Sequence, residues 1–190
     1  MTPLPILLAS KSPRRKDILT LANVPFEIFS IETNEDFPSD LSIVDIPIHI
    51  AYEKVRAVKP HHPNRIILGA DTVVVLNETI IGKPKNREDA CRILGELSGK
   101  VHQVITGVVI VHGKKEISFS TTTDVEFHPI TTEEIEFYVD TYQPYDKAGA
   151  YAIQEWIGAT AIKRIHGCFY NVMGLPMSEL MPHLKEISKI

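Results

Sequence analysis

Length, composition and charge limit what this 190-residue chain can be. Its 44% hydrophobic residues, 23% charged residues and formal net charge of −4 at pH 7 predict one compact domain, 1–190, with a buried core. A protein that binds duplex nucleic acid usually carries an excess of positive charge, which a chain with a net charge of −4 lacks. A local basic pocket could still hold one small polyanion. We therefore expect a small-molecule partner and no nucleic acid.

Neither a membrane span nor a disulfide framework is predicted. No apolar run approaches the roughly 18 residues of a membrane span, and the start of the chain lacks the pattern of a signal peptide. The two cysteines, Cys91 and Cys168, lie far apart in the sequence, which indicates neither a disulfide framework nor a cysteine-based zinc site. These features predict a cytoplasmic protein without a membrane partner.

The first expected elements are a strand at 6–9 and a helix whose first turn carries two arginines. Ser12 suits the N-cap and Pro13 the first helical position, so Arg14 and Arg15 fall in the first turn. The helix dipole is positive at that end and disfavours each cation by roughly 0.3–1 kcal/mol. A bound phosphate would offset this, because helix N-termini and arginine both suit phosphate. Two solvated arginines are the alternative.

Strands and helices alternate through the rest of the chain. Strands are expected at 26–30, on both sides of an Asn77-Glu78 turn, at 101–111, at 117–127 and near 161–165; helices are expected from Asp45 to Val58, from Asn86 to Gly99, from Thr131 to Val139 and near the C-terminus. The middle of the chain reads as antiparallel hairpins. The sequence therefore predicts an α/β fold with a mixed curved β-sheet and flanking helices rather than a doubly wound parallel sheet.

Charged residues stand at places where the pattern around them is apolar or tightly turned. The apolar strand-like run "ILGADTVVV" is interrupted at Gly69, Ala70, Asp71 and Thr72, and an unpaired buried charge at Asp71 is costly. A carboxylate in a water-filled cleft, binding Mg²⁺ or a proton, is favoured over a purely structural Asp71 paired with the backbone or an arginine. Lys83 lies in the turn "IGKP", with a solvated lysine as the alternative. The loop around Glu35 is rich in oxygen ligands, although such loops are usually just solvated.

The segment "DKAGAYAIQ", 146–154, combines small residues with a glutamine. Small residues permit close backbone approach, and the Gln154 amide offers one acceptor and two donors, which suits the edge of a nucleobase. The sequence has no phosphate-binding loop of the G-x-x-x-x-G-K-[ST] type, no G-x-S-x-G turn and no H-E-x-x-H pair. ATP-driven, serine-hydrolase and zinc-protease functions therefore lose their main support.

Six motifs in register carry a family resemblance. "LASKSPRR", "GADTVV", "GKP", "LSGKVHQVITGV", "DKAGAYAIQ" and "NVMGLP" resemble the Maf family of nucleoside triphosphate pyrophosphatases, and most closely the subgroup that hydrolyses dTTP and UTP. The resemblance implies two lobes around a cleft, a fold related to the inosine triphosphate pyrophosphatases, a divalent metal cofactor (Mg²⁺, with Mn²⁺ an alternative) and often a homodimer. It implies release of a nucleoside monophosphate and pyrophosphate in a house-cleaning role.

The resemblance also implies a role for each matching residue. Asp71 is the implied catalytic proton acceptor; Glu35 and Asp71 are the implied metal ligands; the implied substrate-binding residues are Ser10, Arg14, Arg15, Lys54, Thr72, Lys83 and Gln154. The departures from the family pattern are Glu155 and Trp156, where glycines are common, and Cys168, where a serine is usual.

Base preference follows from three of these positions. Arg14, Thr72 and Gln154 match the positions that separate the subgroups, and a sister subgroup preferring 7-methyl-GTP carries tryptophan, glutamine and glutamate there. A cationic methylated guanine suits an aromatic face and a carboxylate. The N3–H and carbonyls of uracil and thymine instead suit a neutral amide such as Gln154.

Alternative functions stay open at this point. A non-catalytic nucleotide-binding regulator of septum formation would not need Asp71. A phosphatase acting on the terminal phosphate would use the same residue types but release orthophosphate. A 7-methyl-GTP preference also stays open, because Glu155 and Trp156 supply a carboxylate and an aromatic ring one step along the chain.

Overall fold

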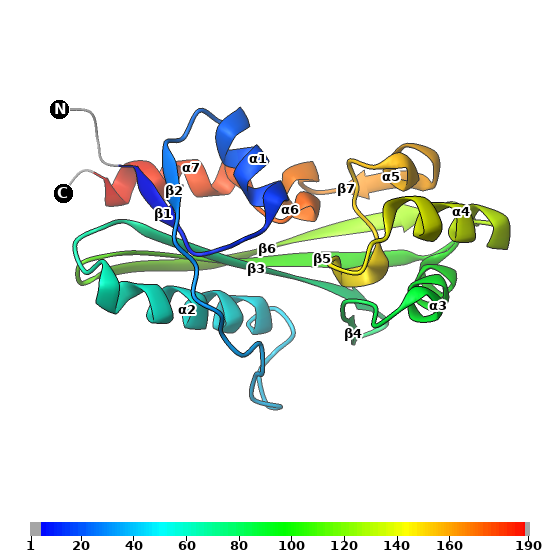
Figure 1. The fold of residues 1–190 in the computed structure, drawn as a ribbon, viewed down its shortest axis with the longest axis horizontal. Helices are drawn as coiled ribbons and strands as arrows, with labels where there is room; N and C mark the ends of the chain where they lie inside the picture. Colours follow the sequence, from blue (N-terminus) through cyan, green and yellow to red (C-terminus); the bar gives the residue numbers. More distant parts are fainter. Residues whose placement is uncertain (1–4, 189–190) are drawn as a thin grey trace. The chain divides into compact units, whose positions relative to one another are not determined.

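In the computed structural model, which describes residues 5–188, the strands form one mixed seven-stranded sheet (Figure 1). The strands are β1 Ile6–Leu8, β2 Phe26–Ile28, β3 Ile67–Leu76, β4 Thr79–Ile81, β5 Val101–His112, β6 Lys115–Phe127 and β7 Ile162–His166. Their order is β2-β1-β3-β5-β6-β7, with β4 beside β3. β1 runs parallel to β2 and β3, whereas the pairs β3–β4 and β6–β7 are antiparallel. The prediction of a mixed sheet is confirmed.

Helices connect most of these strands. They are α1 Pro13–Leu21, α2 Ile46–Val58, α3 Arg87–Leu97, α4 Thr132–Tyr142, α5 Trp156–Thr160, α6 Phe169–Met173 and α7 Met177–Ile187, with short 3₁₀ turns at Lys59–His61 and Ala148–Ala150. None of the helices within residues 5–188 is long and apolar enough to cross a membrane. The sequence did not predict α5 and α6, because five residues are too few to display a helical period.

Helix starts follow local capping chemistry. Asn86 accepts the Asp89 N–H at 2.9 Å, and Thr131 and Glu134 form the predicted capping box at α4. α1 begins at Pro13 as predicted, but Ser12 caps it by position only, since its side chain makes no capping bond to the described helix. The predicted N-cap position of Ser12 is confirmed.

The chain divides into two compact units. The first draws on Met1–Asp71, Thr106–Thr121 and Gly174–Ile190, and the second on Thr72–Ile105 and Thr122–Met173. They correspond to the two lobes expected, and the single-domain assignment over 1–190 stays a prediction.

In the first unit α2 lies on one side of the sheet and α1 and α7 on the other (Figure 1). Ala51, Val55 and Val58 of α2 are buried in a core shared with residues of β1, β3 and β5. The approach is close: a Cβ added at Gly69 would lie 2.6 Å from the Ala51 carbonyl oxygen. The sequence suggested that the strand breaks at the "GA" before Asp71. In the structure β3 is continuous there, and Gly69 marks the place where α2 packs closely against it.

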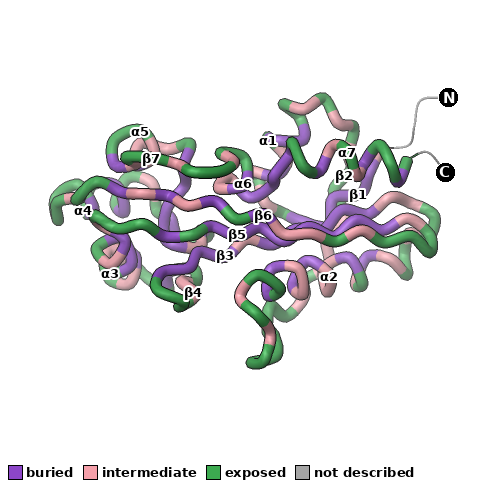
Figure 2. Tube along the Cα trace, turned by 180° about the vertical axis from the view of Figure 1, so that it is seen from behind, coloured by how far each residue is buried: buried purple, intermediate pink, exposed green. Residues whose placement is uncertain are grey.

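In the second unit the core lies between the sheet and helices α3 and α4. Tyr138 and Phe127 are its largest fully buried side chains. Arg87 of α3 donates to both carboxylate oxygens of Asp140 on α4, at 2.6 and 2.9 Å. Figure 2 shows the buried stretches running along β3 and β5. This core supports the segment that carries Gln154.

Candidate functional site

The buried arginine of the first helical turn is held by two hydrogen bonds. Arg15 is 8% exposed. Its Nη1 donates to Oγ of Ser10 at 3.0 Å, and its Nε donates to the carbonyl oxygen of Gly174 at 2.8 Å. Ser10 follows β1 and Gly174 precedes α7, so two ends of elements in the first unit fix the plane of the guanidinium. Ser10 of the motif "LASKSPRR" and Gly174 of the motif "NVMGLP" thus both bind Arg15.

The electrostatic surroundings of Arg15 are mixed. Burial lowers the pKa of Arg15, the carboxylate of Asp71 raises it, the neighbouring Arg14 lowers it and Glu35 raises it. The carboxylates of Asp71 and Glu35 therefore offset part of the electrostatic cost of placing two arginines in the first turn of a helix. The alternative of two solvated arginines is wrong for Arg15, while Arg14 is half-buried.

Lys54 brings the two predicted metal ligands together. Its Nζ lies 2.6 Å from Oδ1 of Asp71 and 3.0 Å from Oε1 of Glu35. The side chains of Lys54 and Asp71 are 14% and 13% exposed, whereas that of Glu35 is 44% exposed. Helix α2, strand β3 and the acidic loop each contribute one member. Three predicted site residues, far apart in the sequence, thus lie next to one another in the first unit.

The chemistry of this group fits a hard divalent cation. Both carboxylates lie within 3.0 Å of one nitrogen, which limits the separation between their oxygens. Mg²⁺ is usually held by one or two carboxylates together with substrate phosphates and waters. Within residues 5–188 no group of three or more His, Cys, Asp or Glu side chains could hold a metal ion by itself. Glu35 and Asp71 are thus of the right residue type for two of the ligands of such an ion.

The remaining predicted residues, Thr72, Lys83 and Gln154, belong to the second unit. Thr72 is half-buried in β3, and Lys83 and Gln154 are exposed. The N–H of Gly149 donates to the Gly82 carbonyl at 3.2 Å. This bond joins the turn that carries Lys83 to the segment that carries Gln154.

Gln154 occupies the corner of a turn. The N–H of Glu155 donates to the Ala152 carbonyl at 3.1 Å, which closes the turn from 152 to 155. Ile153, at the preceding corner, is buried, while Gln154 is exposed. A turn of this kind fixes the direction in which the exposed amide leaves the backbone.

The two family departures beside Gln154 are engaged in contacts within the second unit. The carboxylate of Glu155 accepts the hydroxyl of Tyr138 and lies 3.6 Å from Nζ of Lys147. The ring of Trp156 packs against Phe137 at a centroid distance of 5.0 Å. The role of Tyr138 in these contacts was not predicted from the sequence, because an aromatic residue on the core face of a helix is usually packing alone.

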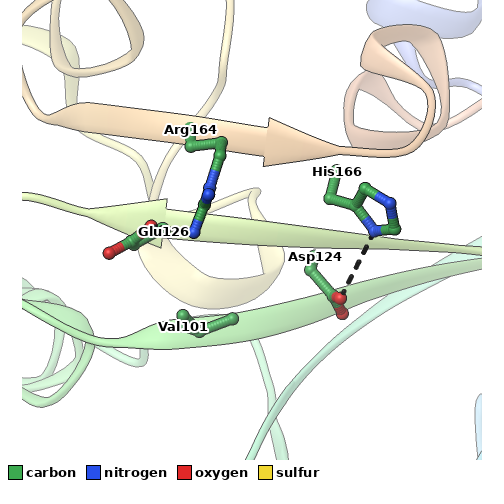
Figure 3. Close-up of a pocket in the computed structure, with 5 residues that line it drawn as sticks. All are labelled: Val101, Asp124, Glu126, Arg164 and His166. Atoms are coloured by element: carbon green, nitrogen blue, oxygen red, sulfur yellow. Dashed lines mark hydrogen bonds and ion pairs between the residues drawn. The ribbon is translucent and has the colours of Figure 1, made fainter.

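A separate hollow lies on the second unit but contains none of the predicted site residues (Figure 3). It has a volume of about 330 Å³ and is lined by Val101, Asp124, Glu126, Arg164 and His166. Glu126 pairs with Arg164 at 3.0 Å, and Asp124 accepts a hydrogen bond from Gln103 at 3.1 Å. Nδ1 of His166 also lies 3.9 Å from Oδ2 of Asp124, so each charged side chain of the hollow has a polar neighbour (Figure 3).

Comparison with known proteins agrees with the motifs. A family model described as Maf-like protein matches residues 5–187. The chain belongs to the Maf-like protein family. A relative from Cytophaga hutchinsonii, named dTTP/UTP pyrophosphatase, is 44% identical over 96% of this chain and 84% of its own length. Relatives of the same name from Bacteroides thetaiotaomicron and Bacillus mycoides are each 45% identical, over 96% and 95% of this chain and 95% and 94% of their own lengths.

A solved structure resembles this Maf-like protein in fold. The Staphylococcus aureus Ham1 protein matches with a TM-score of 0.50 and 17% identity, covering 96% of this chain and 98% of that one. At this identity the likeness concerns the fold alone. It agrees with the expected mixed sheet with flanking helices.

Proposed function

We propose that this Maf-like protein is a nucleoside triphosphate pyrophosphatase that hydrolyses dTTP and UTP to the nucleoside monophosphate and pyrophosphate. The observation that carries the proposal is the contact of Lys54 with both Asp71 and Glu35, in the unit that also holds buried Arg15. The relatives named dTTP/UTP pyrophosphatase, at 44% and 45% identity, support the choice of substrate.

The proposed roles in the first unit follow from charge and geometry. Arg14, Arg15 and Ser10 bind phosphate oxygens, since guanidinium groups and hydroxyls donate to them. Asp71 takes a proton from the water whose oxygen attacks the α-phosphorus. A bond then forms from that oxygen to phosphorus, and the bond from phosphorus to the oxygen bridging the β-phosphate breaks. Pyrophosphate leaves with the electron pair, and Lys54 holds the Asp71 carboxylate in place.

A divalent cation is part of the proposal, with Mg²⁺ favoured and Mn²⁺ the alternative. Glu35 and Asp71 would hold it, and when bound it would neutralise charge on the phosphate oxygens. Asp71 as base and Asp71 as metal ligand remain two forms of this proposal. Lys83 would add positive charge next to the leaving group.

Base selection is assigned to Arg14, Thr72 and Gln154. The exposed amide of Gln154 accepts from the N3–H of uracil or thymine and donates to an adjacent carbonyl. Arg14 repels the cationic ring of 7-methylguanine. The contacts of Glu155 with Tyr138 and Lys147 support Gln154 rather than its neighbour as the residue that faces the base.

A panel of nucleoside triphosphates tests the proposal. Canonical and modified triphosphates are incubated with the protein and Mg²⁺, and the products are separated by chromatography. Monophosphate and pyrophosphate from dTTP and UTP, abolished by EDTA, are expected. A diphosphate with orthophosphate would instead indicate a terminal phosphatase. Tight nucleotide binding without turnover would favour the non-catalytic regulator.

Other properties are proposed from the composition, the sequence pattern and the family resemblance. These are one domain over 1–190, a homodimer, a cytoplasmic location, a house-cleaning role, and the absence of nucleic-acid and membrane partners. Light scattering during gel filtration tests the dimer.

A further inference from the structure

One hydroxyl group holds both ends of the turn that carries Gln154. The phenol oxygen of Tyr138 accepts the N–H of Ala152 at 3.1 Å and donates to the carboxylate of Glu155. Ala152 and Glu155 are the first and last residues of the turn, which their own backbone bond of 3.1 Å closes. The turn and its side-chain anchor therefore form one connected set of hydrogen bonds.

The anchor itself is rigid. Tyr138 is fully buried on α4 and stacks on Tyr142 at a centroid distance of 5.0 Å. Its carboxylate partner, Glu155, is 21% exposed and lies 3.6 Å from Nζ of Lys147, which is itself 11% exposed. A hydrogen bond to a largely desolvated carboxylate is stronger than one between neutral groups in water. The position of the Tyr138 oxygen is thus fixed from both the helix and the loop.

The opposite side of the turn is equally constrained. Ile153 is buried in the core of the second unit. A Cβ added at Gly158 would lie only 1.7 Å from the Ile153 carbonyl oxygen, so α5 packs directly against the turn. Gln154 is then the exposed member of a turn whose other three residues are held in place.

We propose that Tyr138 is a positioning residue for base selection, acting through Gln154. The inference rests on the proposed function, in which Gln154 reads uracil or thymine. Recognition of a base edge requires its partner amide to be held within about 0.5 Å and 10–20°. An amide on a loose turn would still bind, but with less discrimination. Tyr138 supplies the rigidity and touches no reacting atom.

The variant Tyr138→Phe keeps the ring and removes the hydroxyl. We expect KM for dTTP and UTP to rise about tenfold and discrimination against GTP to fall by a similar factor, with kcat within about twofold of wild type. Tyr142→Phe is the matched control, since no hydrogen bond from its hydroxyl to the described residues is present; it should leave all three quantities unchanged.

A double-mutant cycle separates positioning from general weakening. In a Gln154→Ala background, Tyr138→Phe should cause no further loss of discrimination, because the residue it acts through is gone. Additive losses would overturn the inference, as would wild-type behaviour of Tyr138→Phe. Both results leave the proposed function standing. A Gln154→Ala variant with unchanged discrimination would overturn the role of Gln154 and the inference with it.

A second measurement does not depend on turnover. Hydrogen exchange at the Ala152 and Glu155 amides should speed up about tenfold or more in Tyr138→Phe, while α3 amides stay protected. Unchanged exchange at both amides would overturn the inference even in an inactive protein. If Tyr138→Phe does not fold, Glu155→Ala releases the same turn from its other end. Glu155→Gln keeps an acceptor for the Tyr138 hydroxyl, so this variant should retain most of the discrimination that Glu155→Ala loses.

If the wild-type protein releases no pyrophosphate from dTTP or UTP, the proposed function fails and base selection by this turn fails with it. That result is distinct from the others because it appears before any variant is made.

Discussion

Nζ of Lys54 on helix α2 lies 2.6 Å from Oδ1 of Asp71 in the middle of strand β3, and both side chains are largely buried. A buried carboxylate without a partner is costly, so Lys54 compensates for the desolvation of Asp71. The same ammonium reaches the more exposed Glu35 at 3.0 Å. One lysine therefore connects a fixed carboxylate on the sheet with a second one on a loop.

The first prediction concerns the charge on Asp71. Asp71→Asn keeps the shape of the side chain but neither accepts a proton nor carries a charge for a metal ion. We expect kcat to fall by about 10²–10⁴-fold while the protein stays folded, as judged by circular dichroism and urea unfolding. Asp17→Asn, on the exposed side of α1, is the control and should keep wild-type turnover.

Magnesium titration of the Asp71 variant distinguishes base from ligand. A ligand role raises the Mg²⁺ concentration needed for half-maximal rate, whereas a base role lowers kcat and leaves that concentration unchanged. Near-normal turnover in a folded Asp71→Asn protein contradicts both forms of the assignment.

The second prediction concerns the seating of α2 on the sheet. A Cβ at Gly107 would lie 2.2 Å from the Ile48 nitrogen and 2.3 Å from the Pro47 carbonyl carbon. Gly107→Ala must therefore displace the start of the helix that carries Lys54. We expect a loss of about 3 kcal/mol in the free energy of unfolding and a lower kcat. Urea unfolding and steady-state kinetics measure the two effects.

A glycine with free space around it is the matched control for Gly107. A Cβ at Gly95 meets nothing within 4 Å, and Gly95 lies inside α3 on an exposed face. Gly95→Ala should increase stability by about 0.5–1 kcal/mol, because alanine is the better helix former. Equal effects of the two substitutions would contradict the packing argument.

Local chemistry made much of the fold predictable. The capping box of Thr131 and Glu134 and the cap at Asn86 are sequence-local, and both were predicted correctly. The Asn77-Glu78 turn was also predicted; both residues have positive φ, of 49° and 63°, which residue type favours at Asn77. Such features depend on neighbours in the chain and need no knowledge of the tertiary structure.

Features that depend on distant segments were not predictable in this way. The small residues before Asp71 suggested a broken strand, yet Gly69 is small because α2 crosses β3 there. Tyr138 resembled an ordinary core residue, and only the folded chain brings its hydroxyl to Ala152 and Glu155. The residue types of the first-unit site could be proposed from motifs, but the contact of Lys54 with both carboxylates required the structure.

The third prediction concerns stability in acid. His102 is 1% exposed, its Nε2 lies 2.7 Å from the Tyr151 hydroxyl, and burial lowers the pKa of His102 to about 4. In the unfolded chain the histidine pKa is about 6.5, so between these values the unfolded state binds more protons. The stability from neutral His102 is therefore present above about pH 6.5 and is lost as pH falls toward 4, by about 3 kcal/mol.

Urea unfolding between pH 4.5 and 7.5 measures the contribution of His102. His102→Gln cannot gain a proton but still bonds to Tyr151, so its unfolding free energy should decline less steeply in acid than that of wild type. His61→Gln, at an exposed position, should retain the wild-type slope. Parallel pH profiles for wild type and His102→Gln would show that burial of His102 does not govern acid stability.

The last prediction concerns the base. Gln154 is exposed at the corner of a turn, and its amide matches the N3–H and carbonyl of uracil and thymine, whereas a carboxylate in the same place would face a carbonyl without a proton. Wild-type kcat/KM for dTTP and UTP should exceed that for 7-methyl-GTP. Gln154→Glu should selectively weaken the two pyrimidines, by about 10²-fold, because a site built for a hydrogen bond discriminates strongly when the bond is lost. Gln143→Glu makes the same chemical change at another exposed position of the second unit and should leave the ranking as it is. A wild-type preference for 7-methyl-GTP, or an unchanged ranking in Gln154→Glu, would remove Gln154 from base selection while leaving the pyrophosphatase proposal intact, since Gln154 has no proposed role at the phosphates.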